Sequence, residues 1–233
     1  MRRALAALAL ASQALVAQAP GRGPVFTKSD ALVLGAGAIG SAVLIGWDRQ
    51  VSSAVRESPL QRNGGVRSLM DVAGFAGDPG AIIAGAGLWL SGRWAEDRTR
   101  ERLGLRSLEA VIVSGVLTGG GKAIAGRARP DQSPTMPRDF SFGRGFGDRS
   151  EFQSFPSGHA TAAFAFASAI DAELNRVAPR HPAWIVPALY TVAAATALSR
   201  VYHDRHWTSD VVMGSAIGFV GGRVVVQRHG DRR

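Results

Sequence analysis

The chain has 233 residues, enough for one sizeable domain, and it contains no cysteine, which excludes disulfide bridges, thiolate zinc sites and cysteine nucleophiles. Its net charge of +9 is carried almost entirely by arginine and suggests an anionic partner, although solvated arginine-rich loops would give the same balance. The basic residues form no run interleaved with aromatic residues, so nucleic-acid binding is not expected.

The first residues have the layout of an export signal. Two arginines precede an apolar run over 4–17, and a small-x-small cleavage pattern follows at 17–19. Pro20, directly after this pattern, is unfavourable for cleavage at that point. Residues 1–19 are therefore predicted to be a signal peptide or an N-terminal apolar segment, and residues 20–30 a linker.

Six apolar stretches rich in alanine and glycine follow the linker. They are too long for strands and show little alternation, so they are predicted to be helices that are apolar over much of their circumference. Asp78-Pro79 interrupts the second of them. The stretches lie at about 31–47, 69–92, 108–121, 160–170, 184–199 and 211–226. We expect an all-α bundle of about six core helices in one domain over 31–228, with a basic tail at 229–233.

Each stretch is marginal as a membrane span, which needs about 20 predominantly apolar residues. The arginine-rich segment 93–107 and the C-terminal tail would both face the cytoplasm by the positive-inside rule. Six spans then require the chain to enter its first span from the cytoplasm, whereas a cleaved signal peptide would leave that end outside. Either one weak stretch does not span, or the domain is exported whole.

The third stretch leads to the first of three segments whose side chains could bind a ligand or take part in a reaction. Lys122 ends this stretch, and Arg129 stands directly before Pro130; because a residue before proline avoids helical geometry, the helix is predicted to end near there. Arginine suits bidentate phosphate binding and lysine acts as a point charge. Taken alone, the segment is better explained by two solvated cations.

The segment that follows, 131–156, is rich in proline and glycine, which predicts a loop that could serve as a lid or a substrate-binding edge. Its arginines Arg138, Arg144 and Arg149 are better explained as solvated loop residues than as contacts to a substrate.

A second segment leads into the fourth apolar stretch. Ser157 is a good N-cap, Gly158 lets the backbone approach an anion closely, and the free N–H groups of a first helical turn form an anion site. His159 would lie beside whatever anion binds there. Taken alone, an ordinary helix cap with an incidental histidine explains the pattern better.

A third segment precedes the last stretch. His206 and Asp210 are spaced i, i+4, so on a helix they would share one face and could touch. A carboxylate on one imidazole nitrogen fixes the tautomer and frees the other nitrogen for attack. Arg200 adds a third cation, while His203 and Asp204 are further polar groups nearby.

Together the three segments resemble the signature of the type 2 phosphatidic acid phosphatase (PAP2) family, written K-x6-RP, PSGH and SR-x5-H-x3-D. Every fixed position is matched in order, and the match covers about residues 108–226. The same superfamily includes bacterial class A acid phosphatases and vanadium haloperoxidases. The resemblance implies an all-α bundle with its site at one end.

The resemblance also implies how the phosphate would be held. Lys122, Arg129 and Arg200 are expected to bind the phosphate oxygens, assisted by Ser157 and the N–H group of Gly158. No metal and no cofactor are expected, because these cations neutralise the charge.

Three further residues are expected to carry the chemistry. By the resemblance, His206 attacks phosphorus and forms a phosphohistidine. Asp210 orients His206 and stabilises its positive form. His159 protonates the leaving oxygen and then helps to activate water.

The sequence thus predicts a phosphatase that hydrolyses a phosphate monoester or a lipid phosphate or pyrophosphate. Its partners would be a phosphorylated lipid or a small phosphate ester, and membrane association is expected. The protein would belong to the cell envelope, with its site facing the periplasm or the cell exterior. The alternatives are a vanadate-dependent haloperoxidase and a non-catalytic phosphate-binding membrane protein.

Overall fold

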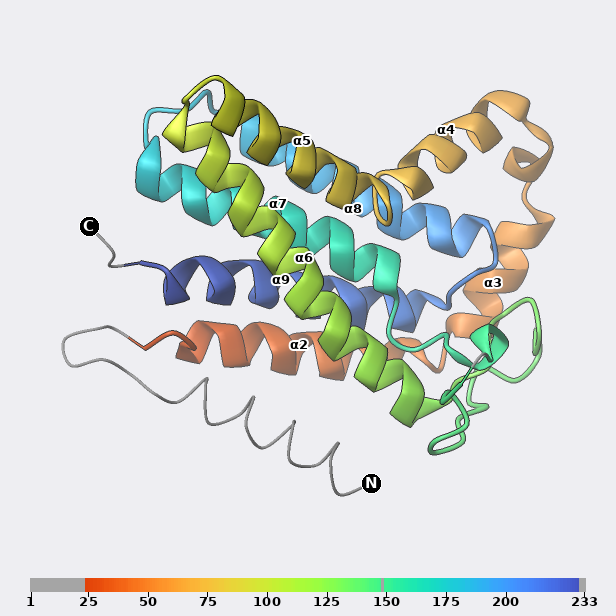
Figure 1. The fold of residues 1–233 in the computed structure, drawn as a ribbon. Coiled ribbons are helices and arrows are strands. Elements are labelled where there is room, and N and C mark those ends of the chain that lie inside the picture. The colour runs from red at the N-terminus through yellow and green to blue at the C-terminus, as the bar shows by residue number, and fades with distance from the viewer. Residues whose placement is uncertain (1–23, 148, 231–233) are drawn as a thin grey trace.

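The computed structural model describes residues 24–147 and 149–230, and every regular element in that part of the chain is helical (Figure 1). The α-helices are α2 (Lys28–Leu44), α3 (Asp48–Glu57), α4 (Gly64–Phe75), α5 (Gly80–Trp94), α6 (Arg98–Ala125), α7 (Gly158–Val177), α8 (Ile185–Tyr202) and α9 (Thr208–Arg228). Two short 3₁₀ helices are η1 (Pro59–Arg62) and η2 (Ser150–Phe152). The all-α prediction is confirmed, whereas the predicted signal segment lies outside the described residues.

The predicted stretches correspond to the long helices, although several of their boundaries differ. The break expected at Asp78-Pro79 separates α4 from α5. Helix α2 begins at Lys28, inside the segment taken as a linker. Helix α6 begins at Arg98, well before its apolar stretch, because Asp97 caps it by accepting a hydrogen bond from the N–H group of Arg100 at 3.0 Å.

Six long helices, α2 and α5–α9, run between two ends of the bundle, with α7 packed against α6, α8 and α9 (Figure 1). Glycines allow the close approach of α7 and α9. A Cβ atom on Gly218 of α9 would lie 2.3 Å from the carbonyl oxygen of Thr161, and one on Gly214 would lie 2.4 Å from that of Ser157. Small residues therefore build the core, as they do between helices packed in lipid.

One end of the bundle is rich in arginine. It contains the start of α2, where Asp30 faces Arg223 of α9 at 3.6 Å, and the start of α6, where Arg102 pairs with Glu173 of α7 at 3.0 Å. We call it the arginine end. The opposite end carries α3, η1, α4 and the segment 126–157 (Figure 1), and we call it the site end because the three predicted motifs meet there.

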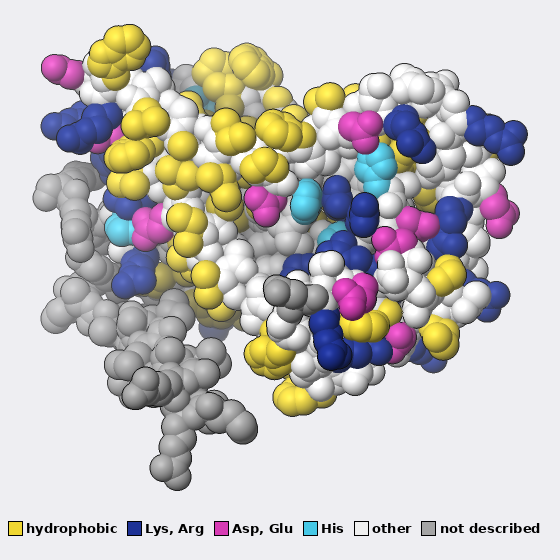
Figure 2. Space-filling model, turned by 45° about the vertical axis from the view of Figure 1, so that its right-hand side comes forward, with side chains coloured by type: hydrophobic (Ala, Val, Ile, Leu, Met, Phe, Trp, Pro, Cys, Tyr) yellow, Lys and Arg dark blue, Asp and Glu magenta, His cyan; other side chains and the backbone are white. Residues whose placement is uncertain are grey.

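The outer surface of the long helices is apolar. Helices α6, α8 and α9 are each long and apolar enough to cross a membrane, and the bent pair of α2 and α3 would make a fourth span. Large hydrophobic side chains such as Val116, Leu117 and Leu198 point outward. Figure 2 shows hydrophobic side chains spread over the bundle, with charged and histidine side chains around a hollow and a second charged group at the left. The chain is therefore membrane-associated.

Candidate active site

The first motif leaves α6 through a tight turn. Lys122 lies in the last turn of α6, and Gly126 ends the helix in the left-handed conformation with φ 54°. Arg129 follows the end of the helix, as its position before proline predicts. Its Nε donates to the carbonyl oxygen of Ser150 at 2.7 Å and its Nη1 to that of Arg205 at 3.1 Å. The two cations are thus fixed at the site end.

The second motif starts α7 and touches both other motifs. Ser157 is the N-cap, as predicted, with its Oγ 3.5 Å from the N–H group of Ala160. The backbone N–H group of Ser157 donates to the carbonyl oxygen of Asp210 at 3.0 Å. A Cβ atom on Gly158 would lie 3.6 Å from Cε of Lys122, so the first motif lies directly against this turn.

Arg200 and His159 line the same cavity. Arg200 is in the last turn of α8, and its Nε has no hydrogen-bond partner among the described residues. The cavity has a volume of about 400 Å³. Its other lining residues are Met70, Asp71, Gly74 and Phe75 of α4, together with Asp78, His203 and Arg205. Helix α4, which no motif predicts, therefore forms one wall of the candidate site.

His206 is buried, with 3% of its surface exposed, and it lies before the N-cap of α9 rather than on that helix. The helical placement considered for His206 therefore does not hold, although its side chain and that of Asp210 do lie close together. Its Nδ1 lies 2.7 Å from the carbonyl oxygen of Ser154 and 3.6 Å from Oδ2 of Asp210. Because a carbonyl oxygen only accepts, Nδ1 carries the hydrogen, and Nε2 keeps its lone pair.

Asp210 is fully buried in the first turn of α9 and contacts several donors at once. Its Oδ2 accepts hydrogen bonds from Ser154 Oγ at 2.5 Å and from the N–H group of Trp207 at 2.9 Å. Its Oδ1 accepts from Nη1 of Arg127. The carboxylate thus reaches His206 chiefly through Ser154, which bonds both residues.

The structure adds residues around the candidate site to which no motif assigns a role. Arg127 lies between Lys122 and Arg129 in the first motif segment, and its pairing with Asp48 and Asp210 is visible only in the structure. Asp48, Ser154 and Ser209 carry no local signal, because their partners are distant in the sequence. In the segment 131–156, Arg144 pairs with Asp139 at 2.8 Å and donates to the carbonyl oxygen of Gly126, so it braces the loop.

Electrostatics keep both histidines neutral. Burial, assisted by the charges of Lys122 and Arg129 and opposed by Asp210, lowers the pKa of His206 to about 3. Burial and the charges of Arg200, Lys122 and Arg129 lower the pKa of His159 to about 4. Lys122 and Arg129 of the first motif therefore act on both histidines, and Arg200 of the third motif acts on His159, as expected for a single site. Within the described part of the chain, no group of three or more histidine and acidic residues could hold a metal ion.

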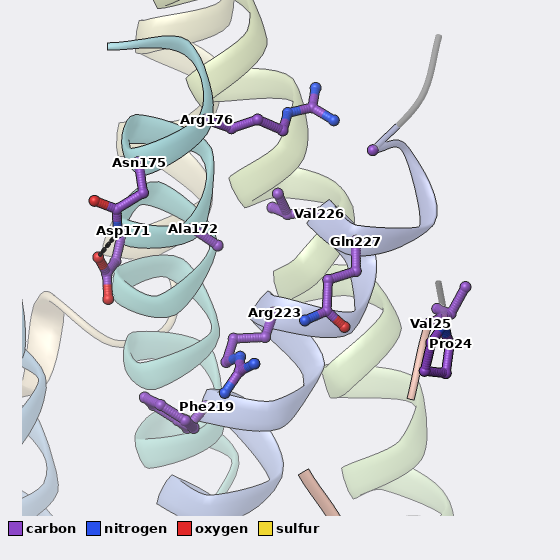
Figure 3. A pocket seen from close by; sticks show the side chains of 11 residues that line it. Pro24, Val25, Asp171, Ala172, Asn175, Arg176, Phe219, Arg223, Val226 and Gln227 are labelled. Atoms are coloured by element: carbon purple, nitrogen blue, oxygen red, sulfur yellow. Dashed lines mark hydrogen bonds between the residues drawn. The ribbon is translucent and has the colours of Figure 1, made fainter. Parts of the chain in front are cut away.

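A larger cavity of about 680 Å³ lies at the arginine end, between α7 and α9 (Figure 3). Its walls include Asp171, Asn175 and Arg176 of α7 and Arg223 of α9. No residue of the three motifs lines it, so its size does not make it the candidate active site.

The helical bundle and the convergence of three motifs at its end define a phosphate-site protein of the PAP2 type, and the family comparison agrees. The family model for the PAP2 superfamily matches residues 103–233, and the chain belongs to this superfamily. The resemblance stated from the motifs is thereby confirmed.

Three relatives are similar to parts of this chain. A lipid A 1-phosphatase from Porphyromonas gingivalis is 41% identical over 85 residues, covering 36% of this chain and 18% of that protein. The lipid A 1-phosphatases of Rhizobium johnstonii and Rhizobium etli are 37% and 34% identical over 46% and 50% of this chain, and the matches cover 40% and 46% of those proteins. The matched part of this chain thus spans less than half the length of each relative.

One solved structure has a similar fold. It is the transmembrane PAP2 type phosphatidylglycerolphosphate phosphatase from Bacillus subtilis, which superposes with a TM-score of 0.62 at 21% sequence identity. The match covers 88% of this chain and 96% of that chain. At this identity the likeness shows the fold alone, and it agrees with the all-α, membrane-associated architecture.

Proposed function

We propose that this protein is a metal-independent phosphatase that hydrolyses a lipid phosphate through a phosphohistidine at His206. The observation that carries the proposal is the buried, neutral His206, whose Nδ1 bonds Ser154 and whose Nε2 keeps its lone pair beside the cations of the motifs. A neutral imidazole held in one tautomer is a nucleophile, and fixed cations stabilise the charge of a phosphoryl group in transfer.

Phosphate binding uses the cations and one helix start. Lys122, Arg129 and Arg200 contact the phosphate oxygens. Lys122 already donates to the carbonyl oxygen of Gln153 at 2.5 Å, which leaves two of its three N–H groups for the ligand. The N–H group of Gly158 and the Ser157 turn add the positive end of α7.

The chemistry proceeds in two balanced steps. First, Nε2 of His206 bonds to phosphorus while the bond from phosphorus to the leaving oxygen breaks, and His159 donates its proton to that oxygen. Second, a water oxygen bonds to phosphorus while the bond from phosphorus to Nε2 breaks, and His159 accepts a proton from the water. The negative charge of a bound phosphate favours the protonated ring of His159 and so raises its pKa. Substrate binding thus favours the form of His159 that can donate a proton to the leaving oxygen.

Two observations favour a lipid as the substrate. Helix α4, which walls the cavity, exposes Leu69 and Val72 to the outside, and Phe75 is both exposed and a lining residue of the cavity, so the site lies next to apolar surface. The relatives named above are lipid A 1-phosphatases, which act on a lipid phosphate. A phosphate attached to a lipid would therefore reach the cavity along α4.

We place the site on the periplasmic or outer face of the membrane. The arginine end carries the basic first turns of α6 and the basic end of α9, and the positive-inside rule puts such segments in the cytoplasm. The site end is at the opposite end of the same helices, which points the cavity away from the cytoplasm. This arrangement has α2 entering from the cytoplasmic side.

The test compares the wild type with His206→Ala and the matched control His181→Ala. His181 lies beyond the end of α7, away from the motifs. Release of phosphate from p-nitrophenyl phosphate and from dioctanoyl phosphatidic acid is measured in detergent without added metal. The proposal expects release that is lost in His206→Ala and kept in His181→Ala. Undiminished release by His206→Ala would refute it.

A further inference from the structure

Arg127 and Asp48 connect the candidate site to a distant part of the fold. Both are essentially unexposed, at 0% and 1%. The guanidinium of Arg127 donates from Nη2 to Oδ2 of Asp48 at 2.8 Å, and its Nη1 contacts Oδ1 of Asp210. One arginine thus bridges two buried carboxylates, one from α3 and one from α9. We call these three residues the clamp.

The arginine of the clamp is held on every side. Its Nε donates to the carbonyl oxygen of Pro137 at 3.0 Å, and its guanidinium lies 4.8 Å from the ring centre of Phe140 and 5.5 Å from that of Trp207. Planar contacts of this kind suit a guanidinium and not an ammonium group. The position of Arg127 is therefore fixed, and so are the carboxylates that it bonds.

Asp48 also fixes the start of α9. Its Oδ1 accepts the backbone N–H group of Ser209 at 3.0 Å, and its Oδ2 accepts the hydroxyl of Ser209 at 2.5 Å. Arg127 donates to the same hydroxyl oxygen at 2.7 Å. Because Ser209 directly precedes Asp210, Asp48 sets the turn that aims the Asp210 carboxylate at Ser154 and His206.

The charges of the clamp match the proposed chemistry. One arginine and two aspartates carry a net charge of −1 next to a neutral His206. When His206 becomes phosphorylated on Nε2 while Nδ1 keeps its hydrogen, its ring is positive and balances that charge. Without Arg127, two buried carboxylates would face each other across Ser209 with no cation between them. The arginine therefore offsets the repulsion between Asp48 and Asp210.

We propose that Arg127 and Asp48 are positioning residues for His206: Arg127 pairs with the Asp210 carboxylate and Asp48 fixes the turn that carries it, so that Asp210 opposes the positive charge of the phosphohistidine. The proposal rests on the function proposed above. It also means that α3, far from the motifs in sequence, takes part in the site.

The kinetic test uses Arg127→Gln, Arg127→Lys and Asp48→Asn, with Arg144→Gln as the matched control. Arg144 is a loop arginine that pairs with an aspartate but does not contact the clamp. Hydrolysis of p-nitrophenyl phosphate is measured per folded protein. We expect kcat to fall about ten- to a hundredfold in Arg127→Gln and Asp48→Asn, with KM within about twofold. Arg127→Lys should recover part of kcat, and Arg144→Gln should keep it.

An unchanged kcat per folded protein in Asp48→Asn and Arg127→Gln would overturn the proposal, as would a rise in KM at constant kcat. If Arg127→Gln does not fold, the nearly isosteric Asp48→Asn decides the question.

A second measurement needs no turnover. Nitrogen-15 NMR of the histidine rings should show His206 with its hydrogen on Nδ1 in every variant, because the Ser154 carbonyl oxygen accepts it. The Nδ1 chemical shift of His206 should change in Arg127→Gln, where the nearby Asp210 carboxylate loses its cation, and stay at the wild-type value in Arg144→Gln. An unchanged shift in Arg127→Gln would count against the clamp. Absence of wild-type phosphate release together with the shift change would instead reject the proposed function and support the positioning role.

Discussion

Both ends of the bundle contain buried carboxylates, but the arginines that pair with them are buried at one end and partly exposed at the other. At the site end, Arg127 is completely buried and every carboxylate oxygen of Asp48 and Asp210 accepts a hydrogen bond. At the arginine end, Glu173 is buried while the side chain of Arg102 remains 42% exposed. The first arrangement fixes geometry at a high desolvation cost, and the second joins helices with cations that stay hydrated.

The largest difference between the ends should appear in catalysis. His159→Asn at the site end removes the proton donor and should lower kcat by about 10²–10⁴-fold, the usual contribution of a general acid–base group. His181→Asn, the corresponding change away from the site, should leave kcat unchanged. Phosphate release at saturating substrate measures both. Equal activities would mean that the cavity at the site end does not carry the chemistry.

Acid should destabilise the site end in particular. The pKa of His206 is lowered by burial from 6.5 to about 3, so the unfolded chain takes up a proton as the pH falls below about 6.5 while the folded protein does not. The free energy of unfolding therefore keeps its full value above pH 6.5 and falls progressively towards pH 3. The titration of His206 lowers it by on the order of 4–5 kcal/mol over this range. Unfolding in detergent as a function of pH should show this slope, and His206→Gln should flatten it. A slope that His206→Gln leaves unchanged would assign the acid sensitivity to other groups.

The clamp and the arginine end should also differ in what an arginine contributes to folding. Arg127→Met leaves two buried carboxylates without their cation and should cost about 3–5 kcal/mol of unfolding free energy. Arg102→Met should cost about 1 kcal/mol or less, because Arg102 is hydrated and Arg176 still faces Glu173 at 3.2 Å. Denaturant unfolding of the two variants measures the difference, and equal losses would remove the distinction between the ends.

The smallest expected difference between the two ends is the effect of replacing one tightly packed glycine at each end by alanine. A Cβ atom on Gly214 would lie 2.4 Å from the carbonyl oxygen of Ser157, and one on Gly92 would lie 2.2 Å from the backbone nitrogen of Glu101. Either substitution by alanine should cost about 1–3 kcal/mol through overpacking. Gly214→Ala should in addition lower kcat, because it displaces the Ser157 turn, whereas Gly92→Ala should not. Thermal unfolding and phosphate release, measured together, separate the two effects.

Local patterns in the sequence were sufficient for most of the fold. Long apolar stretches without strand alternation located the long helices, and a proline and a serine marked the break after Asp78 and the N-cap Ser157. Helix α3 was not predicted, because it is short and polar. The first turns of α6 were also missed, since their stability depends on the Asp97 cap and on nearby ion pairs.

The candidate site was predictable only where its residues fall in motifs. All eight motif residues lie at the site end, while their individual roles remain predictions. The contacts that orient them join positions far apart in the chain: Asp48 bonds Ser209 and Arg127 contacts Asp210. No spacing rule connects such positions, because a loop and a helix bend bring them together. The partner of Nδ1 of His206 was likewise hidden, since it is a backbone carbonyl.

The origin of Asp48 has a consequence for how such proteins can be recombined. The matched family region begins at residue 103 and includes every motif residue, whereas Asp48 belongs to the preceding half of the chain. A chimera that joins residues 103–233 to the N-terminal half of another member would keep its complete signature and yet leave Arg127 facing a foreign side chain. Compatibility between the halves would then depend on whether the donor supplies a carboxylate at the bend that corresponds to the one between α2 and α3.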